Sequence, residues 1–313
     1  MSEHHDGTHH DSAHAHRTHD HTADLDWETL GPFLEQSAEL NASYFEQAAG
    51  WLGELFAEGG RGPGDVGRLL DVGSGPGVAS CLFAGAFPEA EVVAVDGSQA
   101  LLDRTAARAV RLGLADRVRT RCAELPDGFD AVGTADLIWS SHALHHLGDQ
   151  RAAVQRLARS LRPGGVLALA EGGLSARFLP RDVGFGRPGL QARLEAINED
   201  WFTRMRAGLP DAKETVEDWP ALLAAGGLIG AGSRTFLVDL PAPLDAAARL
   251  PLHTELSGQR ERFAEDLDAE DRGTLDRLLD PEDPAGLLLR PDVFVLRAFT
   301  VHTARACRPG AAC

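Results

Sequence analysis

Three glycines at alternate positions follow an aspartate near residue 70, and their spacing is the strongest chemical signal in the chain. Residues 71–77 read Asp-Val-Gly-Ser-Gly-Pro-Gly, after a short apolar run and before an apolar segment over 79–87. A strand, a glycine turn and a helix in this order are typical of nucleotide-binding crossovers. Glycine lets the backbone approach a ligand closely, and the helix N-terminus presents unpaired N–H groups to it. We therefore expect a bound ligand at this turn.

The spacing of the glycines narrows the choice of ligand. A dinucleotide fingerprint needs G-x-G-x-x-G, but the third place after Gly73 and Gly75 is Val78, and the next register ends on Ser80. A P-loop needs Gly-Lys-Ser/Thr, and Lys213 is the only lysine in the chain. A nicotinamide oxidoreductase is therefore disfavoured. A glycine-rich turn of some other α/β protein remains as the plain alternative.

The elements that position this turn alternate between strand and helix. Helices are expected over 99–112 and 149–161, and each lies between apolar runs with the character of buried strands. Such alternation predicts a doubly wound, mostly parallel sheet. The strands are expected at 69–72, 91–95, 117–122, 136–139, 166–170, 236–240 and 293–301.

Three further motifs follow the glycine turn in order. Residues 91–96 read Glu-Val-Val-Ala-Val-Asp, 136–147 end in Ala-Leu-His-His-Leu, and 161–165 read Leu-Arg-Pro-Gly-Gly. Together with 71–77, these motifs resemble those of the class I S-adenosylmethionine-dependent methyltransferases over residues 69–171. The resemblance implies a Rossmann-like sheet of seven strands with the seventh antiparallel. It also implies an enzyme that uses S-adenosyl-L-methionine, yields S-adenosyl-L-homocysteine, and methylates an O, N or C nucleophile of a small molecule.

The resemblance also assigns cofactor contacts. Asp96 is expected to bind the ribose hydroxyls, although it could instead cap the helix that follows. Asp71 is expected to orient the glycine turn and the ammonium of the methionine moiety. Where the family often has Asp-Ala-Glu after strand three, this chain has Cys-Ala-Glu, so the adenine amine is left to Glu124 or a backbone carbonyl, with the Ala123 N–H as a ring contact. The full set of predicted cofactor residues is Asp71, Gly73, Ser74, Gly75, Gly77, Asp96, Gly97, Ser98, Cys122, Ala123, Glu124, Ser140 and Ser141.

Candidates for acceptor chemistry lie beyond strands four and five. A histidine of near-neutral pKa can accept a proton from a nucleophile, so His145 or His146 is a candidate base, with His142 beside them. Glu171 ends strand five, where ligands of open α/β sheets bind. The histidine pair could equally be architecture of the turn, and Glu171 a surface acid. Four arginines could bind an acidic acceptor or form a solvated face: Arg177, Arg181, Arg187 and Arg193.

The chain divides into four predicted parts. Residues 1–26 hold eight of the thirteen histidines and are predicted to be a disordered tail that could bind divalent metal loosely. Residues 27–64 are predicted to form a helical cap and linker, and 65–171 the cofactor-binding core. Residues 172–313 complete the sheet, with substrate-covering helical insertions at about 174–230 and 242–290. No metal site is predicted in the folded part.

Composition limits the partners. A net charge of −17 argues against nucleic acid, and no apolar run is long enough for a membrane span. Four scattered cysteines without zinc spacing and the polar N-terminus favour a cytoplasmic enzyme. The sequence allows a homodimer. A peptide or protein acceptor, or a non-catalytic cofactor- or metal-binding protein, stays open as an alternative.

Overall fold

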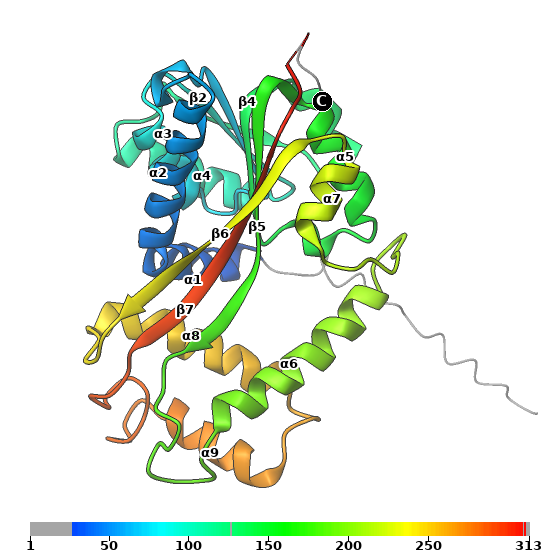
Figure 1. Cartoon of the computed structure of the whole chain (residues 1–313). Helices are drawn as coiled ribbons and strands as arrows, with labels where there is room; N and C mark the ends of the chain where they lie inside the picture. The colour runs from blue at the N-terminus through cyan, green and yellow to red at the C-terminus, as the bar shows by residue number, and fades with distance from the viewer. Residues whose placement is uncertain (1–26, 126, 309, 311–313) are drawn as a thin grey trace, which may run out of the picture.

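A single twisted sheet of seven strands runs through the protein (Figure 1). The computed structural model describes residues 27–125, 127–308 and 310. Strand order is β3-β2-β1-β4-β5-β7-β6, and β7 pairs antiparallel with both β5 and β6 while the other pairs are parallel. The strands are β1 (Arg68–Val72), β2 (Glu91–Asp96), β3 (Val118–Cys122), β4 (Ala135–Ser141), β5 (Leu161–Arg177), β6 (Ile229–Leu240) and β7 (Val295–Arg305).

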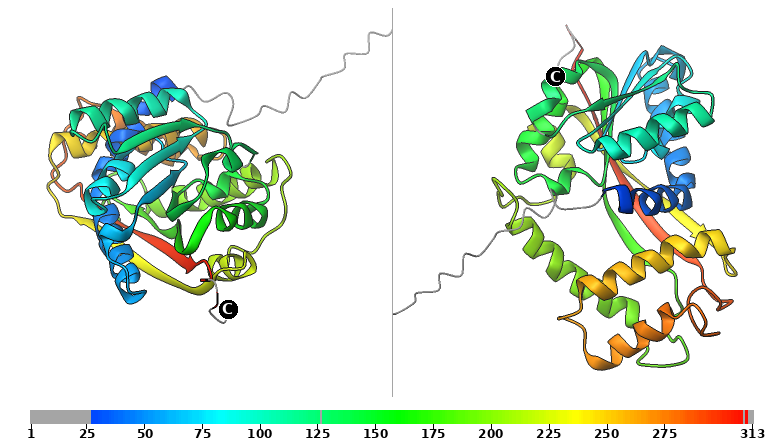
Figure 2. Two further views of the ribbon diagram at one scale, coloured as in Figure 1. Left: turned by 90° about the horizontal axis from the view of Figure 1, so that it is seen from above. Right: turned by 180° about the vertical axis from the view of Figure 1, so that it is seen from behind.

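Helices cover both faces of the sheet, as the views from above and behind show (Figure 2). On one face α2 packs on α3, and α4 packs on β2 and β3. On the other face α5 and α7 pack on each other. The α-helices of the described residues are α1 (Trp27–Leu40), α2 (Ala42–Glu58), α3 (Val78–Ala86), α4 (Gln99–Arg111), α5 (Gln150–Arg159), α6 (Leu190–Ala207), α7 (Trp219–Ala225), α8 (Ala246–Arg262) and α9 (Ala269–Leu279).

The central strands are buried on both faces, which explains their nearly continuous apolar runs. In β1, Leu69 belongs to the core cluster under α2 and α3, whereas Leu70 belongs to the cluster under α5 and α7. Side chains of successive strand residues point to opposite faces, so one apolar run supplies both cores. The predicted fold class, a doubly wound and mostly parallel seven-stranded sheet, is confirmed.

The last three strands are longer than predicted. β5 has 17 residues, whereas a strand was expected only over 166–170, and β6 begins at Ile229 instead of residue 236. The extra residues of β5 continue its pairing with β7 to Arg177, opposite Leu296. The extra residues of β6 pair with the other end of β7, from Ile229 opposite Arg305 to Thr235 opposite Thr300. Pairing of backbone N–H and C=O groups between these strands therefore sets their lengths, which the local sequence does not indicate.

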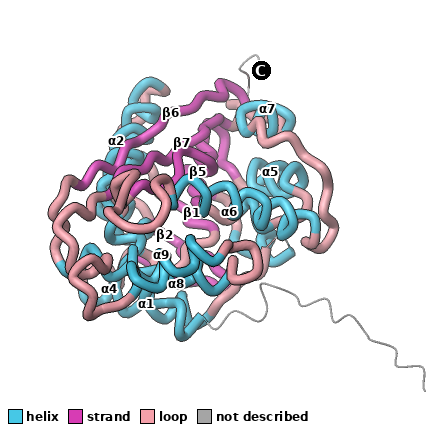
Figure 3. The backbone as a smooth tube through the Cα atoms, turned by 90° about the horizontal axis from the view of Figure 1, so that it is seen from below, coloured by secondary structure: helices cyan, strands magenta, loops and turns pink. Residues whose placement is uncertain are grey.

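Helices α6, α8 and α9 lie around this extended part of the sheet, at the lower end of the molecule (Figures 1 and 3). The predicted helical insertion at about 242–290 holds two helices, α8 and α9, and Asp268 starts α9 by accepting the Asp271 N–H. α1 packs against α8 and α4. The N-terminal helices thus contact both the core and the added helices.

Two sequence predictions concern membranes and the tail. Among the described residues, none of the helices combines the length and apolar character needed to cross a bilayer. The predicted histidine-rich tail at 1–26, with its loose metal binding, lies outside the described residues.

Candidate active site

The glycine turn joins β1 to α3 with three residues in the left-handed region of the backbone. The φ values of Gly73, Gly75 and Gly77 are 70°, 54° and 75°. A side chain on Gly77 would also collide with its surroundings, because an added Cβ would lie 2.4 Å from Thr105 Cγ2. An added Cβ on Gly73 would lie 2.5 Å from Ala143 Cβ, whereas one on Gly75 would meet nothing within 4 Å. The turn is therefore packed on two sides and open at Gly75.

Asp96 at the end of β2 fixes the middle of this turn. Its carboxylate accepts the Gly75 N–H at 2.9 Å through Oδ2 and the Ser98 N–H at 2.9 Å through Oδ1. Burial raises the pKa of Asp96, while the N–H groups of Ser98 and Gly75 act in the opposite direction. The N-cap of α4 is Ser98, whose Oγ accepts the Leu101 N–H, so the alternative that Asp96 caps this helix is wrong. Gly97 lies between them.

Asp71 lies beneath the turn and out of solvent. Its Oδ2 accepts a 2.5 Å hydrogen bond from Ser80 Oγ on α3. Burial raises the pKa of Asp71 to about 7, and the Ser80 hydroxyl only partly offsets this. Ser74 Oγ, also buried, has no hydrogen-bond partner among the described residues. The turn thus contains one polar atom that the protein itself does not use.

Residues 122–124, at the end of β3, lie beside Asp96, and Cys122 pairs with it. The Ala123 N–H donates to the Asp96 carbonyl at 3.0 Å, so the predicted contact of this group with a ring already has a competitor. Cys122 is exposed, and its Sγ contacts the Gly97 carbonyl at 3.5 Å. The Glu124 side chain is exposed. Of this predicted trio, Glu124 keeps its polar atoms accessible.

The two serines at the end of β4 differ in environment. Ser140 is fully buried, and its Oγ donates to the Val72 carbonyl at 2.9 Å, so its hydroxyl serves the sheet rather than a pocket. Ser141 Oγ lies 2.8 Å from the hydroxyl of Tyr44 on α2. Burial raises the pKa of Tyr44, so this side chain is a neutral phenol. Tyr44 therefore ties the N-terminal helices to the carboxyl end of β4.

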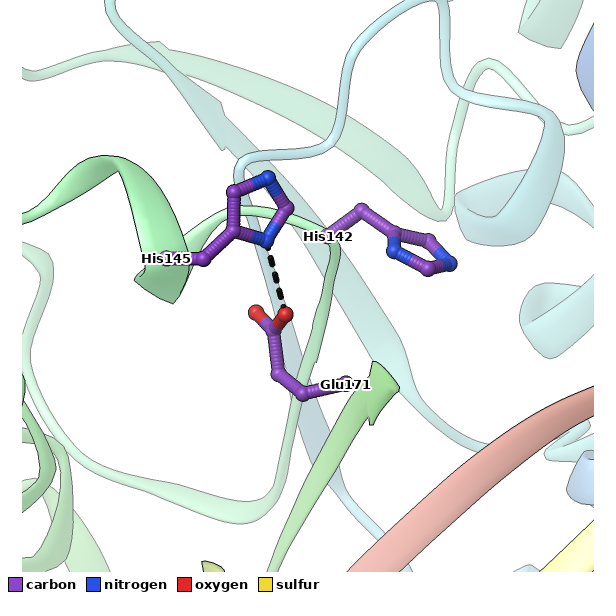
Figure 4. A group of neighbouring side chains, drawn as sticks. All are labelled: His142, His145 and Glu171. Atoms are coloured by element: carbon purple, nitrogen blue, oxygen red, sulfur yellow. Dashed lines mark hydrogen bonds and ion pairs between the residues drawn. The ribbon is translucent and has the colours of Figure 1, made fainter. Parts of the chain in front are cut away.

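The turn after β4 is held by Glu171 from the neighbouring strand (Figure 4). Glu171 Oε1 accepts the N–H groups of Ala143 at 3.2 Å and Leu144 at 2.9 Å, and Oε2 lies 2.8 Å from His145 Nδ1. Burial would raise the pKa of Glu171, but the hydrogen bond from His145 and the nearby imidazoles hold it below its usual range. Glu171 is therefore a buried anion, not the surface acid that the sequence allowed.

His142 and His146 flank this pair. His142 has an unusual φ of 51° for a residue other than glycine and an exposed side chain. Loss of hydration, together with the neighbouring His145, lowers the pKa of His146 to about 4, so its imidazole is neutral at physiological pH. The rings of His145 and His146 lie 4.2 Å apart. Three imidazoles and one carboxylate thus share one edge of the sheet.

Helix α6 supports this histidine turn from outside the core. Arg206 Nη1 donates to the carbonyls of His145 at 2.6 Å and Leu147 at 2.8 Å. The Phe202 ring lies 5.5 Å from the His145 ring. No local pattern in the sequence indicates a role for Arg206 or for the Tyr44 hydroxyl, because their partners lie 59 to 97 residues away along the chain.

The arginines after β5 mostly pair with acids. Arg187 and Arg193 both bind Asp271, and Arg177 binds Glu195. Arg181 is exposed. The ion pairs of Arg193 and Arg177 join α6 to α9 and to β5, respectively. Three of the four candidate arginines thus have ion-pair partners within the protein.

Comparisons with known proteins agree with this geometry. The family model described as "Methyltransferase domain" matches residues 70–167. The chain is 39% identical over 119 residues to a trans-aconitate 2-methyltransferase of Methylobacterium radiotolerans, covering 37% of this chain and 41% of that protein. It is 33% identical over 235 residues to a malonyl-[acyl-carrier protein] O-methyltransferase of Dechloromonas aromatica, covering 66% of this chain and 81% of that protein.

Many matches are shorter. For three of the relatives, the shared segment spans 24%, 41% and 38% of the relative's length. A solved structure of an O-methyltransferase family protein from Burkholderia thailandensis is 13% identical, with a TM-score of 0.47, covering 91% of this chain and 64% of that one. The match to the Dechloromonas protein extends over most of that relative. The chain therefore belongs to the class I S-adenosylmethionine-dependent methyltransferases.

Proposed function

We propose that this enzyme binds S-adenosylmethionine at the glycine turn and methylates an O, N or C nucleophile of a small-molecule acceptor at the same edge of the sheet. One observation carries the proposal: the glycine turn lies directly against the histidine turn. An added Cβ on Gly73 would lie 2.5 Å from the Cβ of Ala143, the residue after His142. A donor held at one turn is therefore within reach of an acceptor held at the other.

The residues present fit this cofactor. Ser74 Oγ is buried without a partner among the described residues, and the space above Gly75 is open. An unpaired buried hydroxyl costs stability unless a ligand satisfies it. The polar amino-acid end of the cofactor would supply that partner, with Asp71 beneath it.

The ribose would bind at Asp96. Each carboxylate oxygen of Asp96 accepts one backbone N–H, and a carboxylate offers about four lone pairs, so both oxygens retain capacity for hydroxyl donors. Gly97 and Ser98 would line this place. The adenine would lie near Cys122, Ala123 and Glu124, with Glu124 as the available acceptor.

The chemistry of the donor limits what the protein must supply. When bound, S-adenosylmethionine supplies a methyl group on a sulfonium, which is already electrophilic. The protein then has to align the two reactants and exclude water, and alignment provides much of the rate. Ser141, His145, His146 and Glu171 would form the polar wall against the acceptor and activate its nucleophile. Ser140, whose hydroxyl is used inside the sheet, would support this wall only indirectly.

The relatives support a small-molecule acceptor. Their names include trans-aconitate, malonyl-[acyl-carrier protein] and 27-O-demethylrifamycin SV methyltransferases. Two of these names specify an oxygen acceptor. Oxygen is accordingly the first nucleophile to test, with the identity of the acceptor molecule open.

Calorimetry with S-adenosylhomocysteine tests the proposal. Asp96→Ala should weaken binding by about 10- to 100-fold, because charge-assisted hydrogen bonds contribute about 1.5–3 kcal/mol. Asp103→Ala is the matched control, since Asp103 is an exposed acid one helical turn into α4. Unchanged affinity of Asp96→Ala would refute the cofactor assignment. Binding without methyl transfer to any member of a panel of hydroxy and carboxylic acids would favour a non-catalytic role.

A further inference from the structure

We propose that His142, His145 and Glu171 bind a divalent transition-metal ion at the acceptor end of the site. Only the description of this place as the acceptor end rests on the proposed function, because metal binding itself is independent of methyl transfer. The three side chains come from the turn after β4 and from β5 (Figure 4). Each offers one ligand atom, and these atoms all lie within 4.8 Å of one another.

The spacing is close to that of a coordination sphere. Metal–nitrogen and metal–oxygen bonds are about 2.0–2.2 Å long, so two neighbouring ligand atoms lie about 3 Å apart and two opposite ones about 4 Å. His145 Nδ1 and Glu171 Oε2, at 2.8 Å, already have the separation of neighbouring ligands. The ligand nitrogen of His142 lies within 4.8 Å of both of these atoms. The hydrogen bond between His145 and Glu171 then represents the ion-free state, in which a proton occupies the ion's place.

His142 is the residue that a simple acid–base pair does not explain. A base made from His145 and Glu171 needs no second imidazole. Yet His142 is held at φ 51°, with its N–H bonded to the Ala170 carbonyl at 3.0 Å. Its ring lies edge-on to the rings of Phe299, at 5.5 Å, and His145, at 6.1 Å. Residues in such sparsely populated conformations cluster at functional sites.

Glu171 is arranged as a metal ligand would be. The N–H groups of Ala143 and Leu144 both bind Oε1, which orients the carboxylate and leaves Oε2 to face the imidazoles. Such hydrogen bonds from outside the coordination sphere are typical of metal ligands. The carboxylate is only 3% exposed. A buried anion is stabilised by a cation at this place.

The donor set predicts the class of ion. Two imidazoles and one carboxylate suit first-row ions such as Fe²⁺, Co²⁺ and Zn²⁺, whereas Mg²⁺ and Ca²⁺ prefer oxygen ligands. Three protein ligands leave positions open for other molecules. An ion here would lower the pKa of an oxygen acid bound to it, which is the activation that an oxygen acceptor needs.

Equilibrium dialysis against Co²⁺ tests the site in the full chain. The histidine-rich residues 1–26 are also predicted to bind metal loosely, so the comparison is between variants that all retain them. Wild type should hold one more Co²⁺ per chain than His142→Asn or Glu171→Gln, with visible absorption that these variants lose. Asparagine tolerates a positive φ, and glutamine keeps an oxygen for the two N–H groups. His253→Gln, on α8, is the control and should match wild type.

The outcomes separate this inference from the proposed function. Equal Co²⁺ stoichiometry and affinity in wild type, His142→Asn and Glu171→Gln would overturn the metal site. Normal S-adenosylhomocysteine binding in these variants would show that they are folded and that the cofactor site is intact. If chelation leaves methyl transfer unchanged while Glu171→Gln slows it, His145 and Glu171 act as a metal-free base and the metal inference is wrong. Loss of one Co²⁺ together with chelator-sensitive transfer supports it.

Discussion

Asp71 and Glu171 are equally buried carboxyl groups whose pKa values shift in opposite directions. Their exposed fractions are 2% and 3%. Burial raises the pKa of Asp71 to about 7, because hydrogen bonds from Ser80 only partly offset it and the nearby Asp96 carboxylate adds to it. Burial acts on Glu171 as well, but one imidazole and two N–H groups hold its pKa below the usual range. The neighbouring hydrogen-bonding and charged groups, not the extent of burial, therefore decide which of the two carboxyl groups is ionised.

The two ends of the candidate site, which contain Asp71 and Glu171, also differ in the groups that form them. The proposed cofactor end consists mainly of backbone, with left-handed glycines and N–H groups within residues 71–98. The proposed acceptor end consists of side chains that converge from β4, β5, α2 and α6. A cofactor common to many enzymes needs one fixed shape, whereas an acceptor site needs polar groups whose protonation and position are controlled.

Removing the partnered acid gives the largest expected effect. Glu171→Leu should lower the free energy of unfolding by about 3 kcal/mol, because it leaves two N–H groups and an imidazole without their buried partner. Urea denaturation at pH 7.5 measures this. The exposed acid Glu124, changed to Leu, serves as control and should shift stability by less than about 0.5 kcal/mol. A loss for Glu171→Leu as small as the control's would mean that the turn holds without the carboxylate.

Asp71, whose pKa is raised, should instead make stability fall as the pH rises. The folded protein keeps a proton on Asp71 up to about pH 7, whereas the unfolded chain releases it near 3.8. Stability contributed by the protonated form is thus present at low pH and lost through pH 7. Between pH 5.5 and 8 the loss should be about 2 kcal/mol, from 1.36 kcal/mol per pH unit.

Asp71→Asn isolates this contribution. The amide cannot ionise, so the difference in unfolding free energy between variant and wild type should grow in favour of the variant as the pH rises. Glu171, with its lowered pKa, has the opposite sign: its contribution is present above pH 4.5 and lost as the pH falls. A parallel pH profile of wild type and Asp71→Asn would show that Asp71 is ionised throughout.

Helix α6 should affect the acceptor end alone. Arg206→Met removes both hydrogen bonds to the carbonyls of His145 and Leu147. We expect kcat to fall about tenfold, which corresponds to about 1.4 kcal/mol, with S-adenosylhomocysteine affinity unchanged. Arg204→Met is matched in helix and residue type, since Arg204 pairs with Asp266 on the surface, and should leave kcat unchanged. Equal loss of cofactor affinity in Arg206→Met would contradict the separation of the two ends.

The smallest effect is expected at the phenol that joins α2 to β4. Tyr44→Phe removes the hydroxyl that bonds Ser141 but keeps the ring stacked 4.2 Å from Phe299. The loss in unfolding free energy should be about 1 kcal/mol, the usual net value of one hydrogen bond. Thermal unfolding followed by circular dichroism can resolve it. Tyr44→Leu, which also loses the stacked ring, should cost more than Tyr44→Phe.

The part of the fold that the sequence predicts is the part set by local signals. Residues 71–77 predict their own turn, because only glycine adopts those backbone angles without strain. Apolar runs predict the five core strands, since strands buried on both faces need apolar side chains throughout. The length of β5, β6 and β7 was not predicted, because it depends on pairing between segments more than 50 residues apart.

The candidate site likewise has a part that local sequence predicts and a part that depends on long-range contacts. The positions of Asp96 and the glycines follow from spacing alone. The bond between Glu171 and His145 does not, because 26 residues and a helix separate them. Nor does the sequence reveal that Ser140 is used by the Val72 carbonyl and Ala123 by the Asp96 carbonyl. These depend on which side chains and strands become neighbours only in the folded sheet.

The continuous strand β5 also limits how the enzyme can move. It runs without interruption from the core, past Glu171, into the region of α6, α8 and α9, and β7 follows it for most of this length. Three shared strands resist the hinged closure of two halves that many enzymes use to enclose a substrate. The pairing of β5 with β7 is irregular at Gly172 and Gly173, where an added Cβ on Gly173 would lie 2.0 Å from the Ala298 carbonyl oxygen. We therefore expect entry of the acceptor and release of the methylated product to involve displacement of helices beside the sheet, not bending of the sheet itself.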